Sequence, residues 1–178
     1  YYKNYAITKN RYVKDITLGN QVVFTDKSTG MIWSGTYAPN YKEPDSYSLA
    51  YSLASSEFRR KDGDIETITN ISIAPKYNME IRKYTLYNSS DIRKEIVINT
   101  ELELAMTEER SNIIHPAFNS LLVEEEYDEN LGALIAKKRP RNNNEEEFYV
   151  FTKLIGIDIE YDMETEKARK INRFIGYE

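Results

Sequence analysis

Alternation of apolar and polar residues is the feature that most limits what this chain can fold into. In residues 65–73, Ile or Thr occupies every second position, and Glu66, Asn70 and Ser72 lie between them. In residues 95–104, Ile and Leu alternate with Glu and Asn. Because side chains of an extended strand point alternately to its two faces, both segments are predicted to be half-buried strands. The residues expected in the core are Ile65, Ile71, Ile73, Ile96, Ile98, Leu102 and Leu104.

Other segments with strand character follow at short intervals along the chain. They cover residues 4–9, 20–26, 31–37, 47–54, 56–60, 79–88, 118–126, 132–138 and 147–157. Turn-forming residues at 26–30, 62–64 and 88–91 predict hairpins, and helical spacing is confined to residues 163–172. This pattern predicts an all-β fold, a large antiparallel β-sandwich with little helix. Since no repeat or boundary is visible, we expect residues 1–178 to form a single domain.

The composition excludes several classes of protein. Of the 178 residues, 40 % are hydrophobic and 30 % are charged, which is typical of a globular domain. The net charge of −5 and the acidic runs at 124–126 and 145–147 argue against nucleic acid as a partner. One histidine and no cysteine exclude disulfides and a conventional zinc site. The sequence has no apolar stretch long enough to span a membrane and no glycine-rich phosphate loop, so we expect no cofactor.

His115 is the single histidine and therefore the one candidate base for a Ser–His–acid triad. No G-x-S-x-G elbow presents a serine to it. We therefore interpret His115 as a residue that ends a strand and hydrogen-bonds locally. The many carboxylates alternate along predicted strands, which is typical of a solvent-facing surface. A small autonomous glycosidase that uses two of these carboxylates stays open as an alternative.

Tyrosine is unusually frequent, with 15 residues, and aromatic residues gather in one stretch at Trp33, Tyr37, Tyr41, Tyr47 and Tyr51. Aromatic rings pack against the apolar faces of sugars, and neighbouring polar groups bind the hydroxyls. This stretch is therefore a candidate sugar platform. Alternatively, Trp33 and Tyr51 belong to the core of the sandwich, where aromatic residues on strands usually lie.

Several stretches carry a family resemblance in the same order along the chain, at 19–26, 29–34, 58–67, 80–83, 86–90, 115–119, 131–134, 139–141 and 173–176. Together they resemble the β-sandwich module of glycosyltransferase family 36, now grouped with glycoside hydrolase family 94. The order H-P-A-F and then R-P-R looks closest, within this cellobiose-phosphorylase-like group, to the cyclic β-1,2-glucan synthases. Leu18, Gly35 and the Lys137–Lys138 pair depart from the family pattern without removing a catalytic group.

In such relatives a supersandwich precedes an (α/α)₆ barrel that holds the catalytic acid and the phosphate site. The resemblance implies that this chain is a non-catalytic module, a fragment of a larger glucan phosphorylase or cyclic β-1,2-glucan synthase, with residues 160–178 leading toward the catalytic domain. The implied partners are the catalytic barrel of the same parent chain, a second copy in a homodimer, and β-glucan; inorganic phosphate would serve the parent enzyme. The implied location is cytoplasmic, with tethering to the inner membrane through the parent protein as a variant. A free-standing carbohydrate-binding module is the alternative.

Residues 115–119 and 139–141 are predicted to form the docking face for the barrel, because proline interrupts strand pairing in both. His115 and Phe118 would be its anchors, and the two arginines would pair with acidic residues of the partner. In the alternative, Phe118 closes the end of the sandwich and His115 caps a strand. No catalytic or metal-binding residue is expected. The candidates for carbohydrate binding or docking are Trp33, Tyr37, Arg59, His115, Phe118, Asn119, Arg139 and Arg141.

Overall fold

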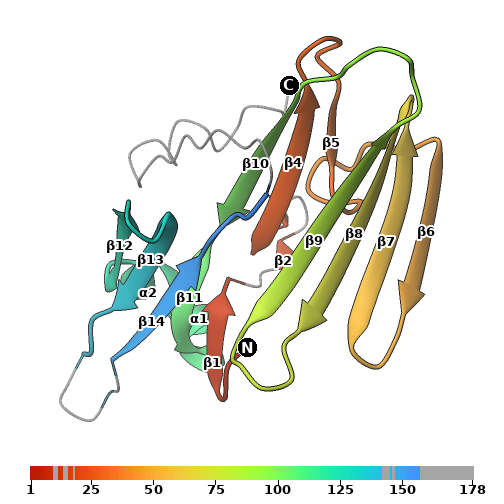
Figure 1. The fold of residues 1–178 in the computed structure, drawn as a ribbon. Coiled ribbons are helices and arrows are strands. Elements are labelled where there is room, and N and C mark those ends of the chain that lie inside the picture. The colour runs from red at the N-terminus through yellow and green to blue at the C-terminus, as the bar shows by residue number, and fades with distance from the viewer. Residues whose placement is uncertain (10–11, 14–15, 18, 142–144, 146, 157–178) are drawn as a thin grey trace. The chain divides into compact units, whose positions relative to one another are not determined.

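The computed structural model describes residues 1–156 except 10–11, 14–15, 18, 142–144 and 146 (Figure 1). Every strand pairing in this part of the chain is antiparallel, which confirms the predicted all-β class. Two short helices are also present, α1 (Glu109–Ile114) and α2 (Pro116–Ser120). The strands are β1 (Tyr5–Thr8), β2 (Tyr12–Val13), β3 (Ile16–Thr17), β4 (Asn20–Asp26), β5 (Ile32–Ser34), β6 (Ser46–Tyr51), β7 (Ser55–Asp62), β8 (Ile65–Ile73), β9 (Glu80–Asn88), β10 (Ile96–Leu102), β11 (Leu104–Glu108), β12 (Val123–Asp128), β13 (Ala133–Lys138) and β14 (Phe148–Thr152).

The chain divides into two compact units. The central unit consists of residues 10–102, and the terminal unit consists of residues 1–9 and 103–178. Strands β2 to β10 lie in the central unit, whereas β1, β11 to β14 and both helices lie in the terminal unit. The predicted helix at 163–172 and the predicted exit segment at 160–178 lie outside the described residues. The single-domain organisation stays a prediction.

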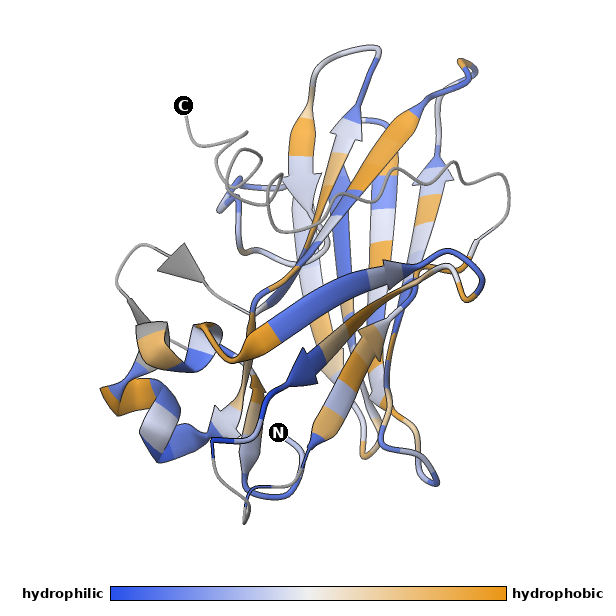
Figure 2. Cartoon of the chain, turned by 90° about the vertical axis from the view of Figure 1, so that its left-hand side faces the viewer, coloured by the Kyte–Doolittle hydropathy of each residue, from blue (hydrophilic) through white to orange (hydrophobic). Residues whose placement is uncertain are grey.

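Two antiparallel sheets face each other in the central unit. One has the strand order β6-β7-β8-β9, and the other has the order β10-β4-β5. Between them the ring centroid of Phe24 lies 5.6 Å from that of Trp33 and 5.7 Å from that of Tyr84, and Val22 and Ile65 complete the buried cluster. Apolar and polar residues alternate along these strands (Figure 2). This arrangement confirms the predicted antiparallel sandwich.

The predicted core residues are buried to different extents. Ile65 and Leu104 are buried, but Ile73 at the end of β8 is 62 % exposed, so the prediction for Ile73 is wrong. Alternation predicts the face on which a side chain lies but not where the neighbouring strands end, and here β7 pairs with β8 only as far as Ser72. The remaining predicted core residues are half-buried; they are Ile71, Ile96, Ile98 and Leu102.

Two of the three predicted hairpins are confirmed, at 26–30 between β4 and β5 and at 62–64 between β7 and β8. In the first, the buried Asp26 carboxylate accepts hydrogen bonds from the Ser28 backbone N–H (2.8 Å), the Ser28 hydroxyl (2.6 Å) and Lys94 Nζ (3.1 Å). These bonds, those of Ser28 first, hold the pKa of Asp26 well below its usual range. The positive φ of Gly30, 71°, closes this turn.

The third predicted hairpin, at 88–91, is wrong because β9 and β10 belong to different sheets. The Asn88 side chain accepts from the Ser90 backbone N–H (3.1 Å) and donates to the Ile92 carbonyl (2.7 Å), so a local turn does form. The chain then crosses from one sheet to the other. Turn-forming residues predict that the chain bends, whereas the pairing of the flanking strands depends on where their apolar faces are buried.

The terminal unit combines a two-stranded sheet of β1 and β11, a three-stranded sheet in the order β12-β13-β14, and the two helices. The predicted strand at 118–126 is only partly correct, because residues 116–120 are helical and β12 begins at Val123. Pro116 occupies the start of α2, where its fixed φ suits a helix and its missing N–H needs no partner. A proline that interrupts a strand and one that starts a helix look alike in sequence.

Candidate functional site

The two proline-containing segments that were predicted to form a docking face come together in the terminal unit. Asn119 on α2 is 1 % exposed, and its Oδ1 accepts a hydrogen bond of 2.7 Å from Arg141 Nη2. The Asn119 amide also donates to the carbonyls of Ser111 (2.8 Å) and His115 (2.9 Å). Arg141 Nη2 further donates to the hydroxyls of Thr107 (3.1 Å) and Ser111 (3.0 Å). Asn119 and Arg141 thus fasten both helices to β11.

His115 lies at the junction of the two helices rather than at the end of a strand. Its backbone N–H donates to the Ser111 carbonyl (2.9 Å), and its own carbonyl accepts from the Asn119 backbone N–H (3.1 Å). The side chain is exposed and makes no capping hydrogen bond to either helix. The prediction that His115 bonds locally is therefore confirmed for its backbone, and its imidazole faces solvent.

An exposed apolar surface covers the two helices. Phe118 is 52 % exposed, and three apolar neighbours are exposed with it: Ile113 (67 %), Ile114 (53 %) and Leu121 (72 %). We call these four residues the α1–α2 surface; both helices carry apolar segments in Figure 2. The guanidinium of Arg141 lies 5.8 Å from the centre of the Phe118 ring and makes a cation–π contact with it. Phe118 therefore does not close the end of a sandwich.

Three of these four apolar residues were missed by the sequence reasoning. Ile114 ends α1 and Phe118 lies on α2, so the four residues do not share one helical spacing that the sequence could show. The second half of the segment was also assigned to a strand, in which these residues would point to both faces.

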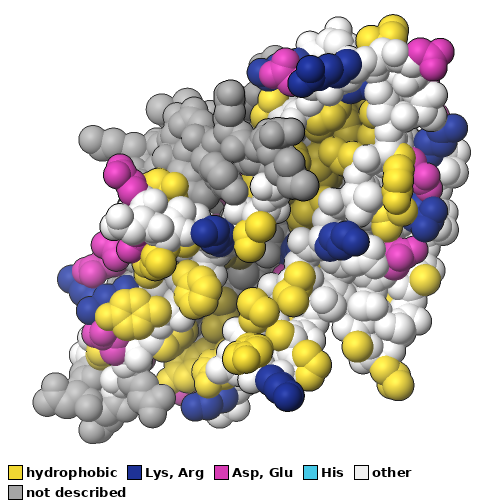
Figure 3. Space-filling view, viewed as in Figure 1, with side chains coloured by type: hydrophobic (Ala, Val, Ile, Leu, Met, Phe, Trp, Pro, Cys, Tyr) yellow, Lys and Arg dark blue, Asp and Glu magenta, His cyan; other side chains and the backbone are white. Residues whose placement is uncertain are grey.

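The basic cluster at 137–141 pairs with carboxylates of its own chain. Hydrophobic, basic and acidic side chains lie mixed over β12–β14 at the lower left of Figure 3. The ion pairs are Lys137–Glu147 (3.0 Å), Lys138–Glu145 (3.5 Å), Arg139–Glu124 (3.0 Å) and Arg141–Glu145 (3.6 Å). Burial lowers the pKa of Lys138, whose side chain is 2 % exposed. Arg139 and Arg141 thus pair within their own chain, and their pairing with acidic residues of a partner stays a prediction.

The aromatic stretch divides into a core residue and a surface cluster. Trp33 is fully buried, and its Nε1 donates a hydrogen bond of 2.9 Å to Thr67 Oγ1. It cannot serve as a sugar platform. Tyr37, Tyr41 and Tyr47 remain between 37 % and 45 % exposed, and the Tyr37 ring makes edge contacts with the other two at centroid distances of 5.8 and 6.4 Å. We call these three residues the tyrosine cluster.

Adjacent arginines on β7 have opposite environments. Arg59, the predicted candidate, is exposed and pairs with Glu57 (3.5 Å) and Glu66 (3.1 Å). Arg60 is 0 % exposed and binds both carboxylate oxygens of the buried Asp62, at 2.6 and 2.8 Å. Arg60 also donates to the carbonyls of Thr36 and Lys42. It therefore fastens the loop that carries Tyr37 and Tyr41 to the sheet, a role that the sequence reasoning missed.

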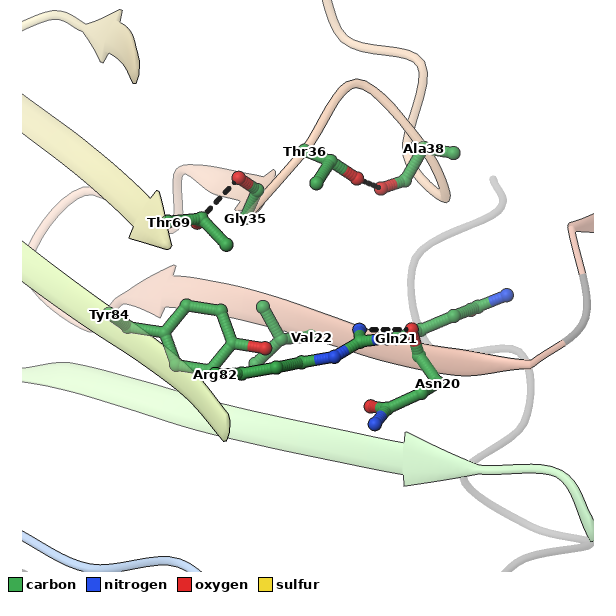
Figure 4. A pocket seen from close by; sticks show the side chains of 9 residues that line it. All are labelled: Asn20, Gln21, Val22, Gly35, Thr36, Ala38, Thr69, Arg82 and Tyr84. Atoms are coloured by element: carbon green, nitrogen blue, oxygen red, sulfur yellow. Dashed lines mark hydrogen bonds between the residues drawn. The ribbon is translucent and has the colours of Figure 1, made fainter. Parts of the chain in front are cut away.

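A small pocket of about 60 Å³ lies in the central unit (Figure 4). On its walls Arg82 donates to the Asn20 carbonyl (2.7 Å) and Thr69 donates to the Gly35 carbonyl (2.7 Å). A Cβ at Gly35 would lie 2.6 Å from Val22 Cγ1, so glycine is required where the chain leaves β5 beside Val22 of β4. The lining contains neither Asp nor Glu and thus no acid–base pair for glycoside hydrolysis; it consists of Asn20, Gln21, Val22, Gly35, Thr36, Ala38, Thr69, Arg82 and Tyr84.

Neither a metal centre nor a membrane-crossing helix is found in the described part of the chain. No group of three or more His, Asp or Glu side chains in this part is placed to hold a metal ion. None of its helices is both long and apolar enough to cross a membrane.

The two antiparallel sheets that face each other across the buried core of the central unit define the class: a β-sandwich domain. The sequence matches, over residues 1–178, the family described as glycosyl hydrolase 94, supersandwich domain. The chain therefore belongs to the supersandwich domain family of glycosyl hydrolase 94. No curated protein matches it.

Proposed function

We propose that this chain is a non-catalytic module of a carbohydrate-active enzyme, of the glucan phosphorylase or cyclic β-1,2-glucan synthase type. It supports the catalytic (α/α)₆ barrel domain of the same parent chain by binding it through the α1–α2 surface. The exposure of four large apolar side chains on a rigidly fastened helix pair is the observation that carries this proposal. Clustered exposed apolar side chains on a domain surface mark sites of protein contact.

The energetics favour docking on this surface. Burial of one large apolar side chain contributes about 1.5–3 kcal/mol, and a central aromatic anchor usually dominates an interface. The hydrogen bonds of Asn119 and Arg141 to each other and to Ser111 hold the helices in place before binding, which lowers the entropy lost on association. Phe118 supplies the aromatic anchor, with Ile113, Ile114 and Leu121 around it.

Phe118→Ser is expected to weaken binding of the 178-residue chain to the separately produced catalytic domain at least tenfold, which corresponds to about 1.4 kcal/mol. Isothermal titration calorimetry measures this affinity. Phe151→Ser is the matched control, because Phe151 is 73 % exposed on β14, and it should change the affinity less than about twofold. Equal weakening by the two substitutions, or glucan phosphorolysis by the 178-residue chain alone, would contradict the proposal.

A second candidate function is binding of glucan chains by the tyrosine cluster. Three half-exposed rings, two of which lie 5.8 and 6.4 Å from the central Tyr37 ring, offer apolar faces to sugar rings. The Tyr37 hydroxyl donates to Glu43 (2.6 Å), and this bond raises the pKa of Tyr37. A neutral phenol and an oriented carboxylate would then both be available to sugar hydroxyls.

Titration of the chain with short β-1,2-glucans by calorimetry tests this second function. We expect saturable binding that Tyr37→Ala reduces at least tenfold, whereas Tyr87→Ala, on an exposed tyrosine of β9, leaves it unchanged. Circular dichroism checks that both variants fold. The absence of heat at millimolar glucan would leave only the scaffold function.

A further inference from the structure

The walls of the small pocket in the central unit have a composition that suits a sugar ring. Arg82 and Tyr84 of β9 lie on one side, and the loop that carries Thr36 and Ala38 lies across from them (Figure 4). Arg82 and Asn20 have planar polar side chains, and Tyr84 adds an aromatic ring. Planar polar groups bind sugar hydroxyls, and an aromatic ring packs on the apolar face of a sugar.

Two of the lining side chains keep hydrogen-bonding capacity for a ligand. Arg82 donates from Nη1 to the Asn20 carbonyl (2.7 Å) and from Nε to Glu80 (2.6 Å). These bonds use two of the five N–H groups that a guanidinium carries. Burial raises the pKa of Tyr84, so its phenol stays protonated at neutral pH and is able to donate and to accept.

The inner end of the pocket is closed. Val22 and Thr69 lie there, and both are buried. Gly35 packs against them, since a Cβ at this position would lie 2.6 Å from Val22 Cγ1 and 3.0 Å from Thr69 Oγ1. The volume of about 60 Å³ corresponds to about five water molecules. This is enough for the hydroxyl groups of one sugar ring, but a continuous chain cannot pass through.

The pocket and the tyrosine cluster share one loop. Thr36 and Ala38 line the pocket, and Tyr37 of the cluster lies between them in the chain, with its Cα about 3.8 Å from each of theirs. Arg60 and Ser34 hold this loop, because both donate to the Thr36 carbonyl, at 2.8 and 2.6 Å. A glucan that lies on the Tyr37 ring therefore has the pocket within reach of its terminal ring.

We propose that the pocket binds the terminal sugar ring of a glucan whose next rings lie on the tyrosine cluster. Arg82 and Tyr84 bind the hydroxyl groups of that terminal ring. This inference rests on the second proposed function, glucan binding by the tyrosine cluster, and adds its specificity. The site selects linear glucans, because a cyclic glucan has no terminal ring to insert into a closed pocket.

Calorimetric titration of the 178-residue chain with linear β-1,2-glucan oligosaccharides, and with cyclic β-1,2-glucans of similar size, tests this specificity. We expect the linear oligosaccharides to bind at least about tenfold more tightly, since they alone gain the hydrogen bonds of the pocket. The two kinds of glucan share the same sugar and the same linkage. The comparison therefore isolates the effect of the chain end.

Substitutions in the pocket test its part in binding. Arg82→Gln should weaken binding of the linear oligosaccharides at least about tenfold, and Tyr84→Phe about three- to tenfold. Tyr84→Phe keeps the ring that lies 5.7 Å from that of Phe24 in the core. Lys83→Gln is the matched control and should have no effect, because Lys83 is exposed on the opposite face of β9. Circular dichroism checks that all three variants fold.

Equal affinity for linear and cyclic glucans would overturn this inference. So would binding of linear glucans that both Arg82→Gln and Tyr84→Phe leave unchanged. In either case, weakening by Tyr37→Ala would show that the tyrosine cluster still binds glucan, so the second proposed function would stand. The absence of heat with both kinds of glucan would overturn that function and this inference with it.

Discussion

Replacement of Arg60 by Met is expected to lower the free energy of unfolding by about 3–5 kcal/mol. The Arg60 guanidinium is fully buried and binds both oxygens of the Asp62 carboxylate, which is also buried. Without Arg60, the Asp62 carboxylate keeps one cationic neighbour, Lys42 Nζ at 3.4 Å, whose side chain is 38 % exposed. The carbonyls of Thr36 and Lys42 also lose a donor. Urea unfolding followed by circular dichroism measures the change.

Arg59→Met is the matched control for this prediction. Arg59 is the preceding residue on the same strand, but its two ion pairs are exposed, so the expected cost is below about 1 kcal/mol. The double variant Arg60→Met/Asp62→Leu should cost less than the sum of the single variants, because it removes the uncompensated charge. Equal effects of Arg59→Met and Arg60→Met would show that the buried pair does not stabilise the fold.

Trp33→Ala is expected to destabilise the chain by about 3–5 kcal/mol. Trp33 is 0 % exposed, stacks on Phe24 in the central core, and donates a hydrogen bond to Thr67. Truncation removes the largest fully buried side chain and leaves a cavity between the two sheets. Circular dichroism during urea unfolding is the suitable measurement, because Trp33 is the single tryptophan and its fluorescence is lost with it.

Trp33→Phe separates packing from hydrogen bonding at this position. It keeps an aromatic ring next to Phe24 but removes the donor to Thr67, whose side chain is buried. The expected cost is about 1–3 kcal/mol, well below that of Trp33→Ala. If Trp33→Ala left stability unchanged, the position of Trp33 in the core would be contradicted, and the sugar-platform interpretation would return.

Alternation in the sequence predicted the sheets well, because burial of one face acts on every second residue. Strands β4, β7, β8, β9 and β10 all overlap predicted strands. Alternation could not predict the extent of cover on each face, and Ile73 is exposed for that reason. It places Arg59 and Arg60 on opposite faces of β7 but does not show which of the two is buried. The sequence shows an arginine and an acidic residue in both cases, so it does not distinguish a buried ion pair from an exposed one.

The candidate site was predicted in part. The pairing of residues 115–119 with 139–141 in space is consistent with their selection as one surface, and Asn119 and Arg141 bind each other directly. Their role differs from the predicted one, because they hold the helices from within while Ile113, Ile114 and Leu121 provide the exposed apolar area. Hydrogen bonds between residues far apart in sequence depend on the fold, and a single sequence does not show them.

Hydrogen exchange of the chain, alone and with the catalytic barrel domain proposed as its partner, tests the docking proposal most directly. Amides that a partner covers exchange more slowly, and mass spectrometry of peptides locates them. We predict slower exchange on binding in peptides that cover residues 109–122, with β7 and β8 unchanged. Unchanged exchange at 109–122, or slower exchange confined to other elements, would contradict the assignment of the α1–α2 surface as the docking face.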